Sequence, residues 1–161
     1  MPNILKHLAR ILIRGRDEGP RTQAQRRAND LDVAVLDMEV FRELHATLGS
    51  DVERVRGVYA KFLESTAARI DELRHQPVAA SLKTLHALKG SAGMVGASRL
   101  EILAARLQDA ATEQHGAPGA VESGAIEAGV IEAGAINDVE SELAAFRGVL
   151  ESELDSVTHP R

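Results

Sequence analysis

Apolar residues recur every three or four positions through most of the chain, a spacing that predicts amphipathic helices. A short helix should begin after Asp37, whose carboxylate is a favourable N-cap, and should end at Gly49. A longer helix should start at Ser50 or Asp51 and continue to about His75. The inward positions of these two helices are expected to be Val40, Phe41, Leu44, Leu48, Val52, Val55, Val58, Tyr59, Phe62, Ile70 and Leu73.

Pro77 should break this helix, because proline removes a backbone donor and disfavours helical conformation in the residue before it. Further helices are expected over about 78–96, 98–111 and 138–154. Their inward positions should include Val78, Leu82, Leu85, Leu88, Ala92, Val95, Leu100, Leu103, Ala104, Leu107, Ala111, Val139, Leu143, Phe146 and Leu150. No convincing period-two alternation predicts a strand. The expected fold is all-α, an up-and-down four-helix bundle with a short additional helix in front.

Residues 1–30 differ in character from the bundle. Apolar residues repeat at helical spacing among basic ones in the first twelve positions, and a polar stretch follows. We expect an extra N-terminal amphipathic helix, which caps the bundle or lies on a partner or an anionic membrane, and then a linker. Residues 31–161 should form the bundle, with a Gly-rich insert at about 116–137 that leaves it or extends a flanking helix.

Composition and charge narrow the range of possible sites, locations and partners. The chain has no cysteine, which excludes disulfides, thiolate metal sites and cysteine nucleophiles and favours a cytoplasmic location. No apolar run approaches the length of a membrane span, and the first residues lack the features of a signal peptide. Residues 1–27 carry seven Lys/Arg against two Asp/Glu, whereas the remaining residues carry twelve against twenty-two. An acidic body argues against nucleic acid as its partner.

The candidate chemistry lies in the string Leu85-His86-Ala87-Leu88-Lys89-Gly90-Ser91-Ala92-Gly93. Helical geometry places His86 opposite the apolar stripe, with Lys89 and Gly90 on its own side and Gly93 one turn further. A neutral exposed imidazole is a nucleophile, and a nearby ammonium stabilises an anion that it accepts. Each helical glycine costs about 1 kcal/mol relative to alanine, a cost explained if another protein's backbone approaches here. Without Gly-Lys-Ser/Thr or a preceding strand, the string is not a nucleotide-binding loop.

The motif His86-x-x-Lys89-Gly90, followed by Gly96, resembles that of histidine-phosphotransfer (HPt) domains of bacterial multistep phosphorelays. The similarity extends over about residues 36–112. It implies that His86 accepts a phosphoryl group from the aspartate of one receiver domain and gives it to the aspartate of another. Lys89 would stabilise that group, and Gln108 on the next helix would hydrogen-bond the phosphohistidine.

The resemblance also implies partners, namely receiver domains of a hybrid histidine kinase or a response regulator. They are expected to dock at Leu82, Lys83, Gly90 and Gly93. The chain itself should be a monomeric carrier without an ATP site, a metal or a cofactor, since Mg²⁺ would belong to the receiver. Its starting Met1 favours a free-standing carrier over a piece of a larger kinase. The identity of the receivers, the direction of transfer and the controlled output do not follow from the sequence.

Two other functions remain as alternatives. The phosphoacceptor and dimerisation helix of a sensor histidine kinase typically has an acidic residue after its histidine, whereas Ala87 follows His86 here. In a purely structural helical adaptor, His86 would be incidental. Residues without a comparable neighbourhood are expected to be ordinary surface histidines: His7, His45, His75, His115 and His159.

Overall fold

The structure, a computed structural model, describes residues 32–116 and 131–158, and the chain from Val33 onward forms one compact unit. The described residues form five helices and no β-strand, which confirms the expected all-α fold. The helices are α3 (Met38–Thr47), α4 (Val52–His75), α5 (Val78–Met94), α6 (Ser98–Gly116) and α7 (Ala133–Thr158). The helix and linker expected in residues 1–30, and most of the Gly-rich insert, lie outside the described residues.

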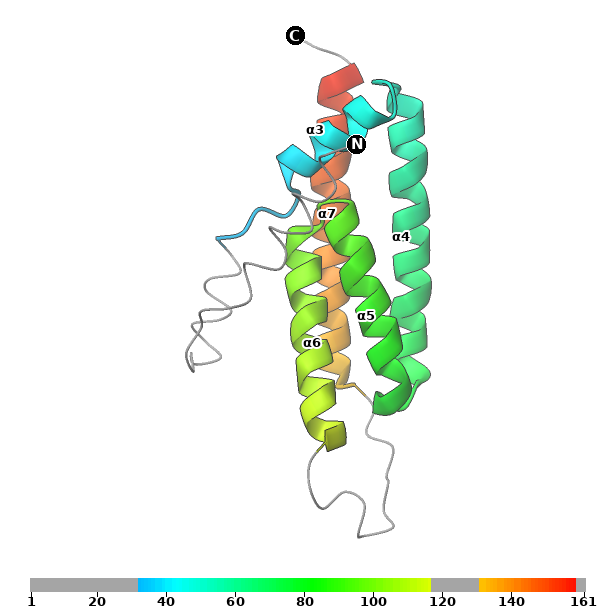
Figure 1. Cartoon of the computed structure of the whole chain (residues 1–161), viewed down its shortest axis with the longest axis vertical. Coiled ribbons are helices and arrows are strands. Elements are labelled where there is room, and N and C mark those ends of the chain that lie inside the picture. The colour runs from blue at the N-terminus through cyan, green and yellow to red at the C-terminus, as the bar shows by residue number, and fades with distance from the viewer. Residues whose placement is uncertain (1–31, 117–130, 159–161) are drawn as a thin grey trace. The chain divides into compact units, whose positions relative to one another are not determined.

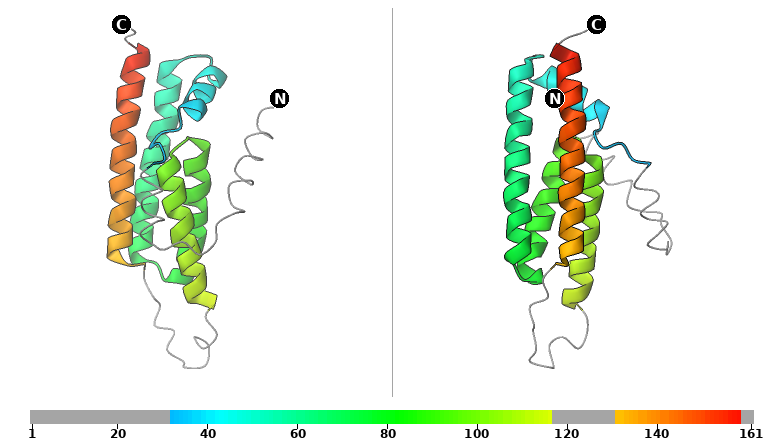
Figure 2. Two further views of the ribbon diagram at one scale, coloured as in Figure 1. Left: turned by 90° about the vertical axis from the view of Figure 1, so that its left-hand side faces the viewer. Right: turned by 180° about the vertical axis from the view of Figure 1, so that it is seen from behind.

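Helices α4 to α7 lie side by side, and each runs opposite to its neighbour in the chain (Figure 1). The short helix α3 crosses the end of the bundle where α4 begins and α7 ends, as two further views also show (Figure 2). The backbone N–H of Asp37 donates to the carbonyl of Gly96 at 2.8 Å. This hydrogen bond fixes the start of α3 to the turn between α5 and α6.

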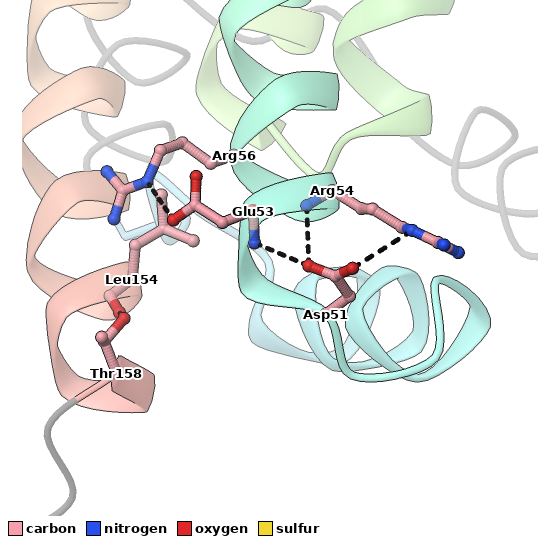
Figure 3. Close-up of polar contacts among 6 residues, drawn as sticks. All are labelled: Asp51, Glu53, Arg54, Arg56, Leu154 and Thr158. Carbon is pink, nitrogen blue, oxygen red and sulfur yellow. Dashed lines mark hydrogen bonds and ion pairs between the residues drawn. The ribbon is translucent and has the colours of Figure 1, made fainter.

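Asp51, and not Ser50, is the N-cap of α4. Its Oδ1 accepts the backbone N–H groups of Glu53 at 3.0 Å and Arg54 at 3.2 Å, and its Oδ2 pairs with Arg54 Nε at 3.1 Å (Figure 3). Ser50 instead has a φ of 58°, in the left-handed region, and belongs to the reversal between the two helices. Asp37 caps α3 through its side chain in the same way. Both helix starts therefore rest on local carboxylate caps.

The four aromatic residues of the chain lie in one cluster near α3. The Tyr59 ring lies 6.1 Å from that of Phe41 and 6.0 Å from that of Phe146, and Phe62 meets Phe146 edge-on at 5.6 Å. The cluster joins α3, α4 and α7, since these helices each contribute to it. Buried aliphatic residues complete the core, among them Val55, Ile70, Leu73, Leu85, Leu88, Leu100, Val139, Leu143 and Leu150.

Burial differs from the expected pattern at several positions. Leu82, expected to face inward, is only partly buried and packs against the core, as do Leu44, Leu48, Val52, Leu103 and Leu107. Thr66, which the apolar pattern does not include, is fully buried, and its hydroxyl has no hydrogen-bond partner among the described residues. Leaving a buried hydroxyl unpaired costs about 1–3 kcal/mol in proteins.

Helix α7 begins earlier than the expected start at about 138. It starts at Ala133, so the end of the predicted insert is helical. The physical reason is Ile136, which is 3 % exposed and continues the stripe formed by Val139 and Leu143 into the core.

Candidate functional site

Helix α5 presents His86 on its outer side because its inner side is fixed in the core. Leu85 and Leu88 are fully buried, and helical geometry directs residue 86 away from both. The helix begins directly after Pro77, whose carbonyl accepts two backbone N–H groups of the first turn at 2.9 and 3.0 Å. The His86 side chain is exposed, as the sequence predicts.

Tyr59 and Gly96 hold the other end of α5. The Tyr59 hydroxyl donates to the Val95 carbonyl at 3.1 Å, and burial raises the pKa of Tyr59 well above its ordinary value of 10.0. Gly96 follows with a φ of 75°, and a Cβ there would lie 3.0 Å from Val40 Cβ. Only glycine fits at this close approach between α3 and the turn. The helix that carries His86 is therefore anchored at both ends.

Two lysines flank His86, one turn away in each direction. At 100° per residue, Lys83 lies roughly 60° around the helix on one side of His86, and Lys89 lies roughly 60° on the other. Lys83 is exposed and Lys89 is partly buried, and neither forms an ion pair with any residue in the described part of the chain. Helix α5 contains no aspartate or glutamate. Within its own helix, His86 thus lies between two cationic side chains, which suit a bound anion.

Gly90 and Gly93 have different surroundings. Gly90 is exposed, and nothing lies within 4 Å of the place where its Cβ would be. A Cβ at Gly93 would instead lie 3.1 Å from the side-chain carboxyl carbon of Glu101 on α6. Gly90 therefore leaves open space beside His86, whereas Gly93 has a second reason to be glycine, the close packing of α5 on α6.

Leu82 and Gln108 lie on the α6 side of the site. Leu82 is on the same side of α5 as Lys89 by the count of 100° per residue. Gln108 is partly buried on α6, and its backbone carbonyl accepts the hydroxyl of Thr112 at 2.8 Å. Among the described residues, its side chain makes no hydrogen bond to His86. Its expected contact with a phosphohistidine stays a prediction.

On the α4 side of α5 the surface is hollowed into a trough of about 530 Å³. We define the trough by its lining residues, which are Arg69, Glu72 and Gln76 of α4 and Ala79, Ala80, Lys83, Thr84 and Ala87 of α5. It begins beside the candidate nucleophile, since Ala87 directly follows His86. Thr84 Oγ1 of the α5 wall donates to Gln76 Oε1 of the α4 wall at 3.2 Å and links the two walls. The sequence pattern did not reveal the α4 wall, because the way the two helices pack decides which α4 residues face α5.

The remaining histidines offer no comparable setting where they are described. His75 is exposed, and its Nδ1 lies 2.9 Å from a backbone carbonyl. His45 is partly buried, and its enclosed Nε2 has no hydrogen-bond partner in the part of the chain that the structure describes, so its prediction as an ordinary surface residue is wrong. The side chains of His7, His115 and His159 lie outside the described residues.

Metal-ligand clusters and membrane-spanning helices are both missing from residues 32–116 and 131–158. No group of three or more His, Asp or Glu side chains there could hold a metal ion. No helix in these ranges is long and apolar enough to cross a membrane. The expectation of a chain without its own metal or cofactor stays a prediction.

A family model described as "Hpt domain" matches residues 57–156, well over half of the 161 residues. The matched span covers most of α4, all of α5 and α6, and nearly all of α7. It includes the His86, Lys89 and Gln108 positions. No curated protein and no solved structure matches the chain.

Proposed function

Since the chain belongs to the Hpt domain family, we propose that it relays a phosphoryl group between aspartates of response-regulator receiver domains through a phosphohistidine at His86. A phosphotransfer role in phosphorelays follows from the family itself, whereas the receivers and the residue roles are the proposal. The observation that carries it is the exposed imidazole between Lys83 and Lys89 on a helix without carboxylates.

The transfer requires little more than positioning and charge stabilisation. A neutral nitrogen of His86 attacks the phosphorus of an aspartyl phosphate in line, so that an N–P bond forms while the O–P bond breaks and the aspartate leaves as a carboxylate. The reverse step passes the group to the aspartate of a second receiver. Lys89 stabilises the phosphoryl oxygens and Gln108 donates a hydrogen bond to them. Mg²⁺ and the acidic pocket belong to the receiver, and the chain is a carrier without an ATP site.

The outer surface of α5 suits the approach of a receiver domain. Gly90 leaves space for a backbone, exposed Lys83 attracts an acidic rim, and Leu82 offers an apolar edge, with Gly93 further along the helix. Because the carrier must release one partner before it meets the next, binding should be transient. We further propose that the carrier is a monomer and that it works in the cytoplasm. The lack of cysteine supports the proposed location.

The test is transfer of a radiolabelled phosphoryl group from purified phosphorylated receiver domains. The wild-type chain should become labelled with acid-labile phosphohistidine, and His86→Gln should abolish the label. His75→Gln is the matched control, since His75 is also exposed on a bundle helix, and it should label normally. Lys89→Ala should slow transfer by about tenfold or more, because the anion loses its ammonium.

Two results would count against the proposal. Labelling of His86→Gln at the wild-type level would exclude His86 as the phosphoacceptor. Labelling of the isolated chain from ATP alone would favour the sensor-kinase alternative over a carrier.

A further inference from the structure

We infer that Lys83 is a second residue that stabilises the phosphoryl group, and that its ammonium contacts the phosphoryl oxygens on His86 from the α4 side. This inference rests on the proposed function and adds a residue to the same site. Lys89 contacts the group from the other side of α5. The phosphoryl group therefore lies between two ammonium groups until a receiver arrives.

The two lysines are placed symmetrically about His86. Each is three residues away, roughly 4.5 Å along the helix axis and roughly 60° around it, in opposite directions. Residues three apart on a helix are neighbours, with Cβ atoms about 5–6 Å from each other. An extended lysine side chain reaches about as far from the helix axis as an imidazole that carries a phosphoryl group. By geometry, the ammonium of Lys83 reaches the phosphoryl oxygens as readily as that of Lys89.

The surroundings of the two lysines differ. Lys89 is partly buried, and its helical neighbours Leu85 and Ala92 are fully buried in the core. Lys83 is exposed and borders the open trough between α4 and α5. Its neighbours three and four positions away, other than His86, are all exposed alanines, namely Ala79, Ala80 and Ala87. The Lys83 side chain can therefore turn toward His86 without displacing another side chain.

Few carboxylates near His86 compete for the Lys83 ammonium. Helix α5 has no aspartate or glutamate. On α4, which lies beside α5 (Figure 1), Arg69 and Glu72 line the same trough as Lys83, but within the described ranges Glu72 forms no ion pair with it. On α6, Glu101 approaches α5 about two turns beyond His86. A phosphoryl group one turn away carries more negative charge than a carboxylate, so it is the favoured partner of Lys83.

The first experiment uses the full-length chain alone, so that receiver docking plays no part. Phosphoramidate, a small phosphoryl donor, loads His86 while its own N–P bond breaks and ammonia leaves, and phosphorus NMR follows the phosphohistidine through a pH titration. A nearby ammonium favours the fully ionised phosphoryl group and lowers its titration midpoint. We expect Lys83→Gln to raise the midpoint by roughly half a pH unit or more. Lys83→Arg keeps the charge and should stay near the wild-type midpoint.

The matched control is Lys61→Gln, which removes the same charge from an exposed position on α4 outside the trough and should leave the midpoint unchanged. A second measurement is the position of the transfer equilibrium with a purified receiver domain. Because Lys83 makes its contact only in the phosphorylated chain, Lys83→Gln should shift this equilibrium toward the phosphorylated receiver by about threefold or more. Weaker docking alone would slow the exchange without moving its equilibrium.

Three outcomes would overturn the inference. If Lys83→Gln keeps the wild-type midpoint and equilibrium but exchanges more slowly, Lys83 contacts only the receiver, and the proposed function stands without the inference. If Lys61→Gln raises the midpoint as much as Lys83→Gln does, the effect comes from net charge and not from a contact. If neither phosphoramidate nor a receiver labels His86 in the wild-type chain, the proposed function and the inference fail together.

Discussion

Tyr59→Phe removes one oxygen atom from the core and leaves the rest of the side chain in place. The ring keeps its contacts with Phe41 and Phe146, but the Val95 carbonyl loses the hydroxyl that donates to it at 3.1 Å. Both ends of this hydrogen bond are buried, so water cannot replace the donor. A buried acceptor left without a partner costs about 1–3 kcal/mol. We expect the free energy of unfolding to fall by that amount.

Thr66→Val, on the same helix as Tyr59, is the matched control, because it also removes a buried hydroxyl but should not lower stability. The Thr66 hydroxyl is also buried, but within residues 32–116 and 131–158 it has no hydrogen-bond partner to lose. Valine keeps the branched shape and replaces an unpaired polar group with a methyl group. The free energy of unfolding should therefore stay the same or rise by up to about 1–3 kcal/mol.

Urea denaturation followed by circular dichroism measures both variants, and equal m-values would show that the unfolded states are comparable. Hydrogen exchange should in addition become faster at the end of α5 in Tyr59→Phe, because the Tyr59–Val95 bond anchors that end. The reasoning is refuted if Tyr59→Phe is as stable as the wild type. It is equally refuted if Thr66→Val loses as much stability as Tyr59→Phe.

Three further outcomes follow from local features. Because the folded chain keeps the Tyr59 proton while the unfolded chain loses it, the contribution of Tyr59 to stability should be constant below about pH 10 and decline above it. Urea titrations of Tyr59→Phe should lack this decline. Gly96→Ala should lower the unfolding free energy by at least about 1–2 kcal/mol, since its φ is 75°, whereas Gly57→Ala, in open space within α4, should raise it by about 0.5–1 kcal/mol in the same assay. Asp51→Ala should cost about 0.5–2 kcal/mol, and thermal melting would contradict the capping role if the midpoint did not change.

The local sequence determined where the described helices start and stop in the first part of the bundle. Asp37 caps α3, Gly49 follows it with a φ of 74°, and Pro77 separates α4 from α5 as predicted. These signals act within a few residues, so they need no knowledge of the rest of the chain. The same holds for the candidate nucleophile, because the fixed spacing within one helix places Lys89 and Gly90 on the side of His86.

Only the tertiary structure decided how the helices are turned toward one another. The Tyr59–Val95 hydrogen bond joins residues 36 positions apart, and no local pattern predicts it. Packing likewise buried Thr66, set Gly93 against Glu101, and brought Arg69 and Glu72 to the α5 side. A helical repeat gives each helix an inner and an outer side, but the side chains of all the helices together fix its rotation and neighbours. The sequence alone therefore identified His86 as the candidate nucleophile, and the packing of α4 beside α5 formed the trough next to it.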